Sequence, residues 1–212
     1  MREADRIVLA SNNRGKLTEF QTLFEKYPPI KVVSAQELLR NSEKISAVET
    51  HESYLENAAA KARLVNLGCH FPALGDDSGL EVEALGGRPG VKSHRYAVPK
   101  AGEPQDEANV RKLLEDLRGR PMEARKARFV CALALVMDGL LISSEGVLEG
   151  MIAEAPAGHN GFGYDPVFIP RGYSKTIAEL REEEKNEISH RALALSALMD
   201  EIRRKGISFA KP

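Results

Sequence analysis

The beginning of the chain constrains the fold most strongly, because a strand pattern passes directly into a helical one. Ile7–Ala10 has the length and composition of a short buried strand. After the polar stretch SNNRGK, apolar residues recur at the spacing of one helix face, namely Leu17, Phe20, Leu23 and Phe24. A strand that is followed at once by a helix is typical of α/β proteins.

The remaining patterns extend this order to a mixed sheet. Strands are expected at 30–33, 127–136 and 139–152, and helices at 52–68 and 108–118. Gly68 is the expected C-cap of the helix before it, and Asp138-Gly139 is a strong hairpin signal. The order of elements predicts an α/β chain, and 212 residues suit one large domain or two tightly joined lobes.

Two further stretches complete this outline. Residues 86–107 hold several Gly and Pro without a clear period, so a long loop is expected there. The tail ISHRALALSALMDEIRRKG is expected to be an amphipathic helix with Ser189 as its N-cap. Its apolar stripe consists of Ile188, Leu195, Leu198 and Ile202.

Composition narrows the range of partners. The formal net charge is −1, so we expect no general attraction to nucleic acid or to an acidic membrane. The start MREADRIVLA has no apolar stretch of signal-peptide length, and residues 1–5 are expected to be frayed. Cys69 and Cys131 form no CxxC pair and are expected to be thiols in a reducing compartment, with a single disulfide between them as the alternative. These features predict a cytoplasmic protein that binds anions only through local basic groups.

The stretch SNNRGK, residues 11–16, suits phosphate binding. A polar loop before a helix can present backbone N–H groups at the positive helix end, and Lys16 adds a full charge. It is not a Walker P-loop, because position 10 is Ala and Leu17 follows the lysine. On this stretch alone, a capped helix start with an exposed lysine is the alternative.

Two adjacent carboxylates, Asp76 and Asp77, stand at the end of an expected strand in ALGDDSGLEV. Like charges this close repel, so a cation or a proton in transit is expected beside them. In extended backbone their side chains point to opposite faces, so only one of them would face a ligand directly. Together with Glu49, Glu52 or Glu56, one carboxylate could form a hard oxygen site for Mg²⁺. The alternative is a turn that ends the strand.

Two later segments carry the other candidates. The loop PAGHNGFGYD, residues 156–165, lets backbone approach a flat ligand on which Phe162 or Tyr164 can stack, unless these aromatics fill the core. His190 and Arg191 begin the last helix at its positive end, and Lys185 lies just upstream. Cations are unfavourable there, which indicates a ligand that needs them, unless the segment is simply solvated.

Together and in this order, these segments resemble one family, the house-cleaning nucleoside triphosphate pyrophosphatases. The matching segments are SNNRGK (11–16), SYLENAAAKA (53–62), DDSGLEVEALGGRPGVKSHRYA (76–97), GFGYDPVF (162–168), KTIAELREEEKN (175–186) and ISHRALAL (188–195). The resemblance implies that ITP, dITP or XTP is cleaved between the α and β phosphates with Mg²⁺. It also implies a single domain over residues 1–212, with an elongated two-lobed fold around a deep nucleotide-binding cleft. In such a fold helices flank a central mixed sheet, and the protein is usually a homodimer.

The resemblance further implies residue roles. Asp77 is the expected catalytic carboxylate and a metal ligand; Glu49 is the second metal ligand, with Glu52 as its substitute. The phosphates are expected at Ser11, Asn12, Asn13, Arg14, Gly15 and Lys16, with Ser78 as a neighbouring contact. The nucleotide pocket is expected at Phe162, Gly163, Tyr164, Asp165, Lys185, His190 and Arg191, the last two near the base.

This chain departs from the family pattern in two places. The family often has Thr-Gly-Asn where this chain has Ser11-Asn12-Asn13, and Glu-Glu where it has Val48-Glu49. Other functions stay open at this stage. A non-catalytic nucleotide-binding regulator would keep the loop and the pocket but would not need the carboxylates. A nucleotide kinase is disfavoured by the missing Walker motif, and an inorganic pyrophosphatase by the small number of carboxylates.

Overall fold

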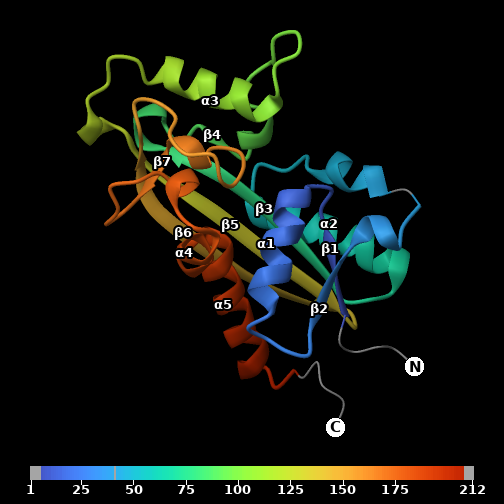
Figure 1. Ribbon diagram of the computed structural model, residues 1–212. Helices are drawn as coiled ribbons and strands as arrows, with labels where there is room; N and C mark the ends of the chain where they lie inside the picture. The colour runs from blue at the N-terminus through green and yellow to red at the C-terminus, as the bar shows by residue number, and fades with distance from the viewer. Residues whose placement is uncertain (1–5, 41, 208–212) are drawn as a thin grey trace. The chain divides into compact units, whose positions relative to one another are not determined.

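The computed structural model describes residues 6–40 and 42–207, so the expectation for residues 1–5 falls outside the described part. The described chain is a mixed α/β structure with five α-helices and a sheet in the order β2-β1-β3-β5-β6-β7, with β4 paired to β3 (Figure 1). The strands are β1 (Arg6–Ala10), β2 (Lys31–Ser34), β3 (Ala73–Val82), β4 (Pro89–Gly90), β5 (Lys126–Met137), β6 (Leu140–Ile152) and β7 (Phe168–Pro170). The helices are α1 (Arg14–Phe24), α2 (Tyr54–Cys69), α3 (Gln105–Asp116), α4 (Glu182–Ile188) and α5 (His190–Arg204).

The sheet is mixed, as the sequence predicts. Strand β1 runs parallel to β2 and to β3, whereas β4 is antiparallel to β3 and β7 is antiparallel to β6. The last residue pair between β1 and β3 is Ala10 with Gly75. The chain after β1 therefore leaves the sheet beside the position where β3 reaches Asp76 and Asp77.

Residue contacts divide the chain into two compact units. The first unit contains Met1–Asp77, Cys131–Gly146 and Arg191–Pro212, and the second contains Ser78–Val130 and Val147–His190. Each unit has a hydrophobic core of its own, and each is described separately below.

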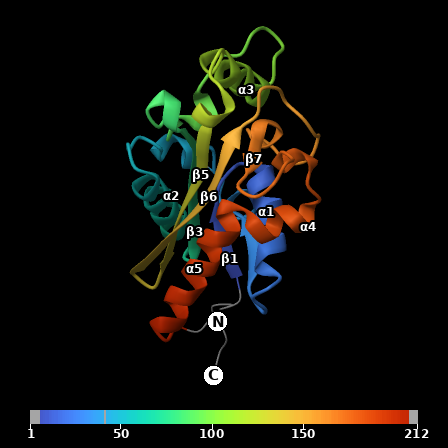
Figure 2. The ribbon, with the colours of Figure 1, turned by 90° about the vertical axis from the view of Figure 1, so that its left-hand side faces the viewer.

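The core of the first unit lies on both faces of its strands. Ile7 and Leu9 of β1 pack in one cluster with residues of α1 and α5, whereas Val8 and Ala10 pack in another with Val65 of α2. This alternation follows from the strand period of two residues. Helix α2 accordingly covers one face, and α1 and α5 cover the other (Figure 2).

The core of the second unit forms between its strands, α3 and the segment 164–180. Phe129 and Phe168 are in ring contact, with centroids 4.5 Å apart. Leu113 of α3 and Leu117, the C-cap that follows the helix, are fully buried in the same cluster. The buried Arg125 guanidinium donates hydrogen bonds to the carbonyls of Leu117, Ile152 and Ala153. A buried guanidinium needs such acceptors, so Arg125 fixes the end of α3 against the ends of two strands.

Several expected elements are confirmed. The first strand and helix lie where their apolar pattern predicts, and Leu195, Leu198 and Ile202 of α5 are buried. Asp138 and Gly139 both have positive φ, +47° and +78°, as a two-residue hairpin between β5 and β6 requires. Cys69 and Cys131 are thiols, as expected.

Other expectations are wrong in their boundaries. The C-cap of α2 is His70, with φ +58°, and not Gly68. The stretch 86–107 is not a continuous loop, because it contains β4, a turn of 3₁₀ helix at Ser93–Arg95 and the start of α3. The predicted tail helix begins only at His190, because Ile188 ends the separate helix α4. Ser189 has extended backbone directly before α5, which is the position expected of its N-cap.

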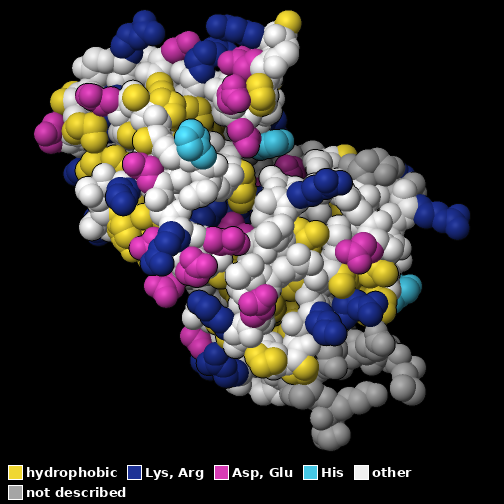
Figure 3. Space-filling view, viewed as in Figure 1, with side chains coloured by type: hydrophobic (Ala, Val, Ile, Leu, Met, Phe, Trp, Pro, Cys, Tyr) yellow, Lys and Arg dark blue, Asp and Glu magenta, His cyan; other side chains and the backbone are white. Residues whose placement is uncertain are grey.

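Acidic and basic side chains are interspersed on the face shown in Figure 3, in agreement with the near-zero net charge. Within the described residues, no helix has both the length and the apolar character needed to cross a membrane.

Candidate active site

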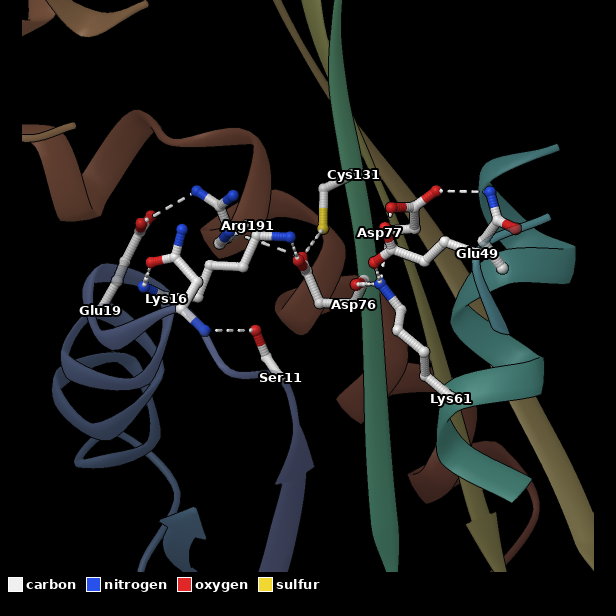
Figure 4. Close-up of polar contacts among 11 residues, drawn as sticks. Ser11, Lys16, Glu19, Glu49, Lys61, Asp76, Asp77, Cys131 and Arg191 are labelled. Atoms are coloured by element: carbon white, nitrogen blue, oxygen red, sulfur yellow. Dashed lines mark hydrogen bonds and ion pairs between the residues drawn. The ribbon is translucent and has the colours of Figure 1, made fainter. Parts of the chain in front are cut away.

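Asp76 and Asp77 lie in the middle of a strand and not in a turn. Strand β3 continues through Ser78 and Gly79 to Val82, so the interpretation of GDDSG as a turn that ends the strand is wrong. Because the backbone is extended, the two carboxylates leave β3 on opposite sides (Figure 4). Asp76 points toward Lys16 and Arg191, and Asp77 points toward α2.

Asp76 is the buried anion that holds two cations. Its carboxylate forms ion pairs with Lys16 of α1 and with Arg191 of α5, the latter at 3.5 Å between Oδ2 and Nε. The Cys131 thiol lies 3.1 Å from Oδ2. Burial alone would raise the pKa of Asp76, but Lys16, Arg191 and Lys61 lower it far below its usual value. The two cations beside it therefore hold Asp76 in its ionised form.

Arg191 has a second carboxylate partner, Glu19 of α1. Its Nη1 lies 3.1 Å from Glu19 Oε2, and both side chains are buried. Glu19 thus ties α5 to α1 and orients the guanidinium next to Lys16. Glu19 was not predicted from the sequence, although an acid beside Phe20 on the apolar face of a helix is a signal of a buried ion pair.

Asp77 is held by two residues that are one turn apart on α2. Asn57 Nδ2 donates to Asp77 Oδ2 at 3.0 Å, and Lys61 Nζ lies 3.5 Å from Oδ1. Residues four apart share one helix face, so a single face of α2 supplies both contacts. Neither residue was singled out from the sequence. The sequence signal for them was two polar residues, four positions apart, among the alanines of the buried helix face.

The close approach of α2 to β3 explains the alanine-rich sequence of this helix. A Cβ added at Gly75 would meet the carbonyl oxygen of Ala58 at 1.9 Å. Ala58 and Ala59 are buried against Ala134. Small residues on both sides therefore bring the α2 backbone near enough for its polar side chains to reach Asp77.

Lys61 connects the carboxylate of Asp77 with that of Glu49. Its Nζ donates to Glu49 Oε1 at 2.6 Å and to the backbone carbonyl of Asp76, and its side chain is almost fully buried. Burial lowers the pKa of Lys61, but Asp77, Glu49 and Asp76 raise it more, so that the net shift is upward. The ammonium group is therefore a permanent cation between two carboxylates from different elements.

The environment of Asp77 differs from that of Asp76. Burial raises the pKa of Asp77, and Glu49 adds to the increase, while Lys61, Lys16 and Asn57 only partly offset it. The net shift is upward, which makes Asp77 a better proton acceptor than an ordinary aspartate. Asp76 is thus held as an anion, whereas Asp77 can act as a base.

The same residues suit a hard cation. Glu49 and Asp77 converge on one ammonium group, which shows that their oxygens can share a positive charge. Glu52 is exposed, so Glu49 is the better candidate of the two. Among residues 6–40 and 42–207 there is no group of three or more His, Cys, Asp or Glu side chains placed to hold a metal. Two carboxylates suit Mg²⁺, which is usually bound by one or two carboxylates together with phosphate oxygens and water.

The loop before α1 has the expected capped geometry. Asn13 is the N-cap, and its side chain accepts the Lys16 N–H at 3.1 Å, while its own N–H donates to Ser11 Oγ. Asn12 is tied to the chain at Ser42 through its side-chain amide. Arg14 is exposed and Gly15 lies in the first turn of α1. Lys16 is not the exposed lysine of the alternative interpretation, because it pairs with Asp76.

In the second unit, the two aromatic candidates of the loop Gly161–Asp165 have different environments. Tyr164 is buried and donates its hydroxyl to the Ser93 carbonyl, so it fills the core. Phe162 is half-buried, and Lys185 Nζ lies 4.8 Å from the centroid of its ring. Of the two, only Phe162 is available for stacking.

Asp165 fixes this loop and Lys185 together. Its Oδ2 accepts the Phe162 N–H at 2.9 Å and pairs with Lys185 Nζ at 2.7 Å. A Cβ at Gly161 would meet the same oxygen at 2.0 Å, so this position needs glycine. Asp165 is therefore mainly an anchor for the loop and for the lysine.

His190 and Ser78 complete the predicted set. The His190 ring is buried and stacks on Phe129 with centroids 4.7 Å apart. Ser78 follows Asp77 in β3 and is half-buried. In the first unit the structure places Lys16 and Arg191 on Asp76, and Glu49 and Asp77 on Lys61. In the second unit it joins Phe162, Asp165 and Lys185. Arg191 forms its ion pairs with Glu19 and Asp76, and its expected position near the base stays a prediction.

Comparisons with known proteins find chains that are similar over nearly the whole length. The model of the Ham1 family matches residues 7–201. A protein from Geobacillus kaustophilus named dITP/XTP pyrophosphatase is 48% identical over 194 residues, which cover 91% of each chain. One of the same name from Bacillus subtilis is 44% identical and covers 93% of this chain and 96% of the relative. The solved structure of the Staphylococcus aureus Ham1 protein has a TM-score of 0.77 at 36% identity and covers 95% of this chain and 98% of the other.

Proposed function

Because the chain belongs to the Ham1 family, we propose that it hydrolyses non-standard purine nucleoside triphosphates such as dITP, ITP and XTP. The products are the nucleoside monophosphate and pyrophosphate. The observation that carries the chemistry is Asp77, which is held by Asn57 and Lys61 and shares that lysine with Glu49. A non-catalytic regulator would not need this arrangement, and the curated relatives are named as pyrophosphatases.

The first unit supplies the phosphate side. Lys16 and Arg191, together with the N-terminal N–H groups of α1, offer positive charge to the triphosphate. Asp76 holds both cations in place before the substrate arrives. Ser11 and Asn13 shape the loop from which these N–H groups are presented. This local charge lets a protein of near-zero net charge bind a polyanion.

Asp77 accepts a hydrogen bond, and then the proton, from the water that attacks the α-phosphorus. Asn57 holds the carboxylate in one orientation for this role. The bond from the α-phosphorus to the bridging oxygen breaks, and pyrophosphate leaves. Lys61 stays protonated and stabilises negative charge that develops beside Asp77.

Mg²⁺ is the metal that suits the donor set. Glu49 and Asp77 would hold it, and when bound it neutralises phosphate charge and lowers the pKa of water. In a magnesium titration, Glu49→Gln should raise the concentration that gives half-maximal activity, whereas the exposed Glu52→Gln should not. An equal effect of both substitutions would remove Glu49 from the proposed site.

The second unit supplies the base side in this proposal. Phe162 offers its ring to the purine, and Lys185 and the loop Gly163–Asp165 supply polar contacts. A donor that faces the 6-oxo group of hypoxanthine or xanthine would be left unpaired by the amino group of adenine, at a cost of about 1–3 kcal/mol. We expect residues 1–212 to act as a single domain, as the family resemblance implies.

Two further properties belong to the proposal. We expect the enzyme to act in the cytoplasm, since both cysteines are thiols, and to form the homodimer implied by the family resemblance. Sedimentation of the purified protein tests the second point.

A panel of ITP, XTP, dITP, GTP and ATP with Mg²⁺ tests the activity. Separate assays for pyrophosphate and orthophosphate should show pyrophosphate alone, with ITP, dITP and XTP strongly preferred over ATP. Release of orthophosphate, or no turnover of any of the five nucleotides, would contradict the proposed function.

A further inference from the structure

The loop Gly161–Asp165 has little intrinsic reason to keep one conformation. Gly161 and Gly163 both have positive φ, +79° and +62°, and a Cβ at Gly163 would meet nothing within 4 Å. Glycine gives the backbone freedom that only specific contacts remove. The position of Phe162, which lies between the two glycines, therefore depends on the hydrogen bonds that the loop makes.

One of these hydrogen bonds comes from α3. Asp106, the second residue of α3, accepts the Gly163 N–H at its Oδ2, at a distance of 2.9 Å. Asp106 was not predicted from the sequence, because it lies outside the segments that carry the family resemblance. The segment that ends closest before α3 is 76–97. The contact connects positions that are 57 residues apart in the chain.

Asp106 is itself held firmly, because α3 is fixed by its own contacts. The buried Asn109 accepts the Ala97 N–H and donates to the His94 carbonyl, and Leu113 is fully buried. The carboxylate therefore presents a fixed acceptor to the loop.

Packing does not replace this contact. A hollow of about 1080 Å³ lies against the loop, and Asp106, Phe162 and Gly163 are among the residues that line it. Where side chains do not fill the space beside a loop, its position depends on hydrogen bonds. The loop is held by specific polar contacts, among them those of the Phe162 N–H and Lys185 with Asp165, of the Tyr164 hydroxyl with the Ser93 carbonyl, and of the Gly163 N–H with Asp106.

We propose that Asp106 is a positioning residue for base recognition: by accepting the Gly163 N–H, it holds Phe162 and its loop in the conformation that receives the purine. Asp106 does not touch the substrate in this account. The inference rests on the proposed function, because it assigns Asp106 to the base side of that site.

Three substitutions separate this role from a purely structural one. Asp106→Ala removes the acceptor and should raise KM for ITP about tenfold while kcat changes less than about twofold. Asp106→Asn keeps an oxygen acceptor and should restore KM to within about threefold of the unchanged protein. Glu107→Ala removes a charge from the same turn of α3 at an exposed position and should leave both constants unchanged.

Hydrogen exchange without nucleotide gives a readout that does not depend on activity. Asp106→Ala should speed amide exchange in the segment 160–166 about tenfold, and Glu107→Ala should not. If Asp106→Ala does not fold, Asp106→Leu keeps the volume of the side chain without an acceptor and takes its place in both assays.

Several results would overturn the proposal. These are an unchanged KM for the variant without an acceptor, a fall in kcat in place of a rise in KM, or failure of Asp106→Asn to restore KM. If the unchanged protein released no pyrophosphate from ITP, the proposed function would fail. The exchange experiment would then still show whether Asp106 holds the loop, and unchanged exchange would overturn that as well.

Discussion

The two units fix their candidate residues in different ways. In the first, Asp76 and Asp77 lie on a regular strand, and charged side chains from α1, α2 and α5 hold them. In the second, the loop Gly161–Asp165 has irregular backbone and is held mainly through its own N–H groups. Charge-paired groups on regular elements suit chemistry, which needs exact placement, and a hydrogen-bonded loop suits recognition of a base. We therefore expect changes in the first unit to alter kcat or stability, and changes in the second to alter KM.

The largest effect is expected at Asp77. Asp77→Asn keeps the size of the side chain but removes the base, so kcat for ITP should fall by about 10³-fold or more. KM should change less than about threefold, because the phosphate contacts are retained. The control is Asp200→Asn, which changes an exposed carboxylate on α5. Steady-state kinetics measure both constants, and a kcat within tenfold of that of the unchanged protein would exclude Asp77 as the base.

Asp76 should show the cost of removing a buried anion. Asp76→Asn leaves Lys16 and Arg191 close together without their shared counter-charge, so the free energy of unfolding should fall by about 3 kcal/mol. The surface pair of Glu81 and Arg128 offers a comparison, and Glu81→Gln should lower this free energy by less than about 1 kcal/mol. Urea unfolding measures both, and similar losses would show that the Asp76 cluster does not stabilise the first unit as proposed.

Phe162 tests the recognition side of the comparison. Phe162→Ala removes the ring on which the purine is proposed to stack, so KM for ITP should rise about tenfold with little change in kcat. The control substitution is Tyr173→Ala, because Tyr173 is an aromatic residue of the second unit with 41% of its surface exposed. A fall in kcat without a rise in KM would assign Phe162 to the chemical step and would contradict the proposed difference between the two units.

The smallest effect concerns stability at alkaline pH. Burial, and the hydrogen bond and charge of Asp116, raise the pKa of Tyr96 to about 12. Because this folded-state pKa lies above the usual value of 10.0, the contribution of Tyr96 to stability is complete below pH 10 and is lost as the pH rises toward 12. The lowered pKa of Asp76 has the opposite consequence, since its contribution is lost only as the pH falls below its usual value.

Tyr96→Phe should therefore reduce the loss of stability between pH 10 and pH 12 without removing it, because burial also raises the pKa of Tyr164. Urea unfolding at pH 9 and pH 11 measures the difference. An unchanged slope would show that Tyr96 does not contribute to this loss.

The parts of the fold that the sequence predicts are those set by local patterns. The apolar period gave β1 and α1, and the Asp138-Gly139 pair gave the hairpin. The strand period of two also predicted that Asp76 and Asp77 would leave on opposite faces. Each of these features depends on residues that are close together in the chain.

The features that the sequence did not predict depend on contacts between residues that are far apart in the chain. GDDSG has the composition of a turn, but pairing with other strands keeps it in β3. Lys61 looks like an ordinary helix lysine until Gly75 and the alanines of α2 bring the helix onto β3. Asp106 is an acid in the first turn of a helix, where such residues are common, and only the fold places Gly163 against it. The sequence names the candidate residues, and the tertiary contacts decide which of them meet.

The central claim is that the protein directs water to the α-phosphorus of its substrate, and isotope labelling tests it most directly. Hydrolysis of ITP in ¹⁸O-labelled water, followed by mass spectrometry of both products, shows which phosphorus the water attacks. Attack at the α-phosphorus should place the label in the inosine monophosphate and leave the pyrophosphate unlabelled. Label in the pyrophosphate would mean attack at the β-phosphorus and would contradict the role assigned to the Asp77 cluster.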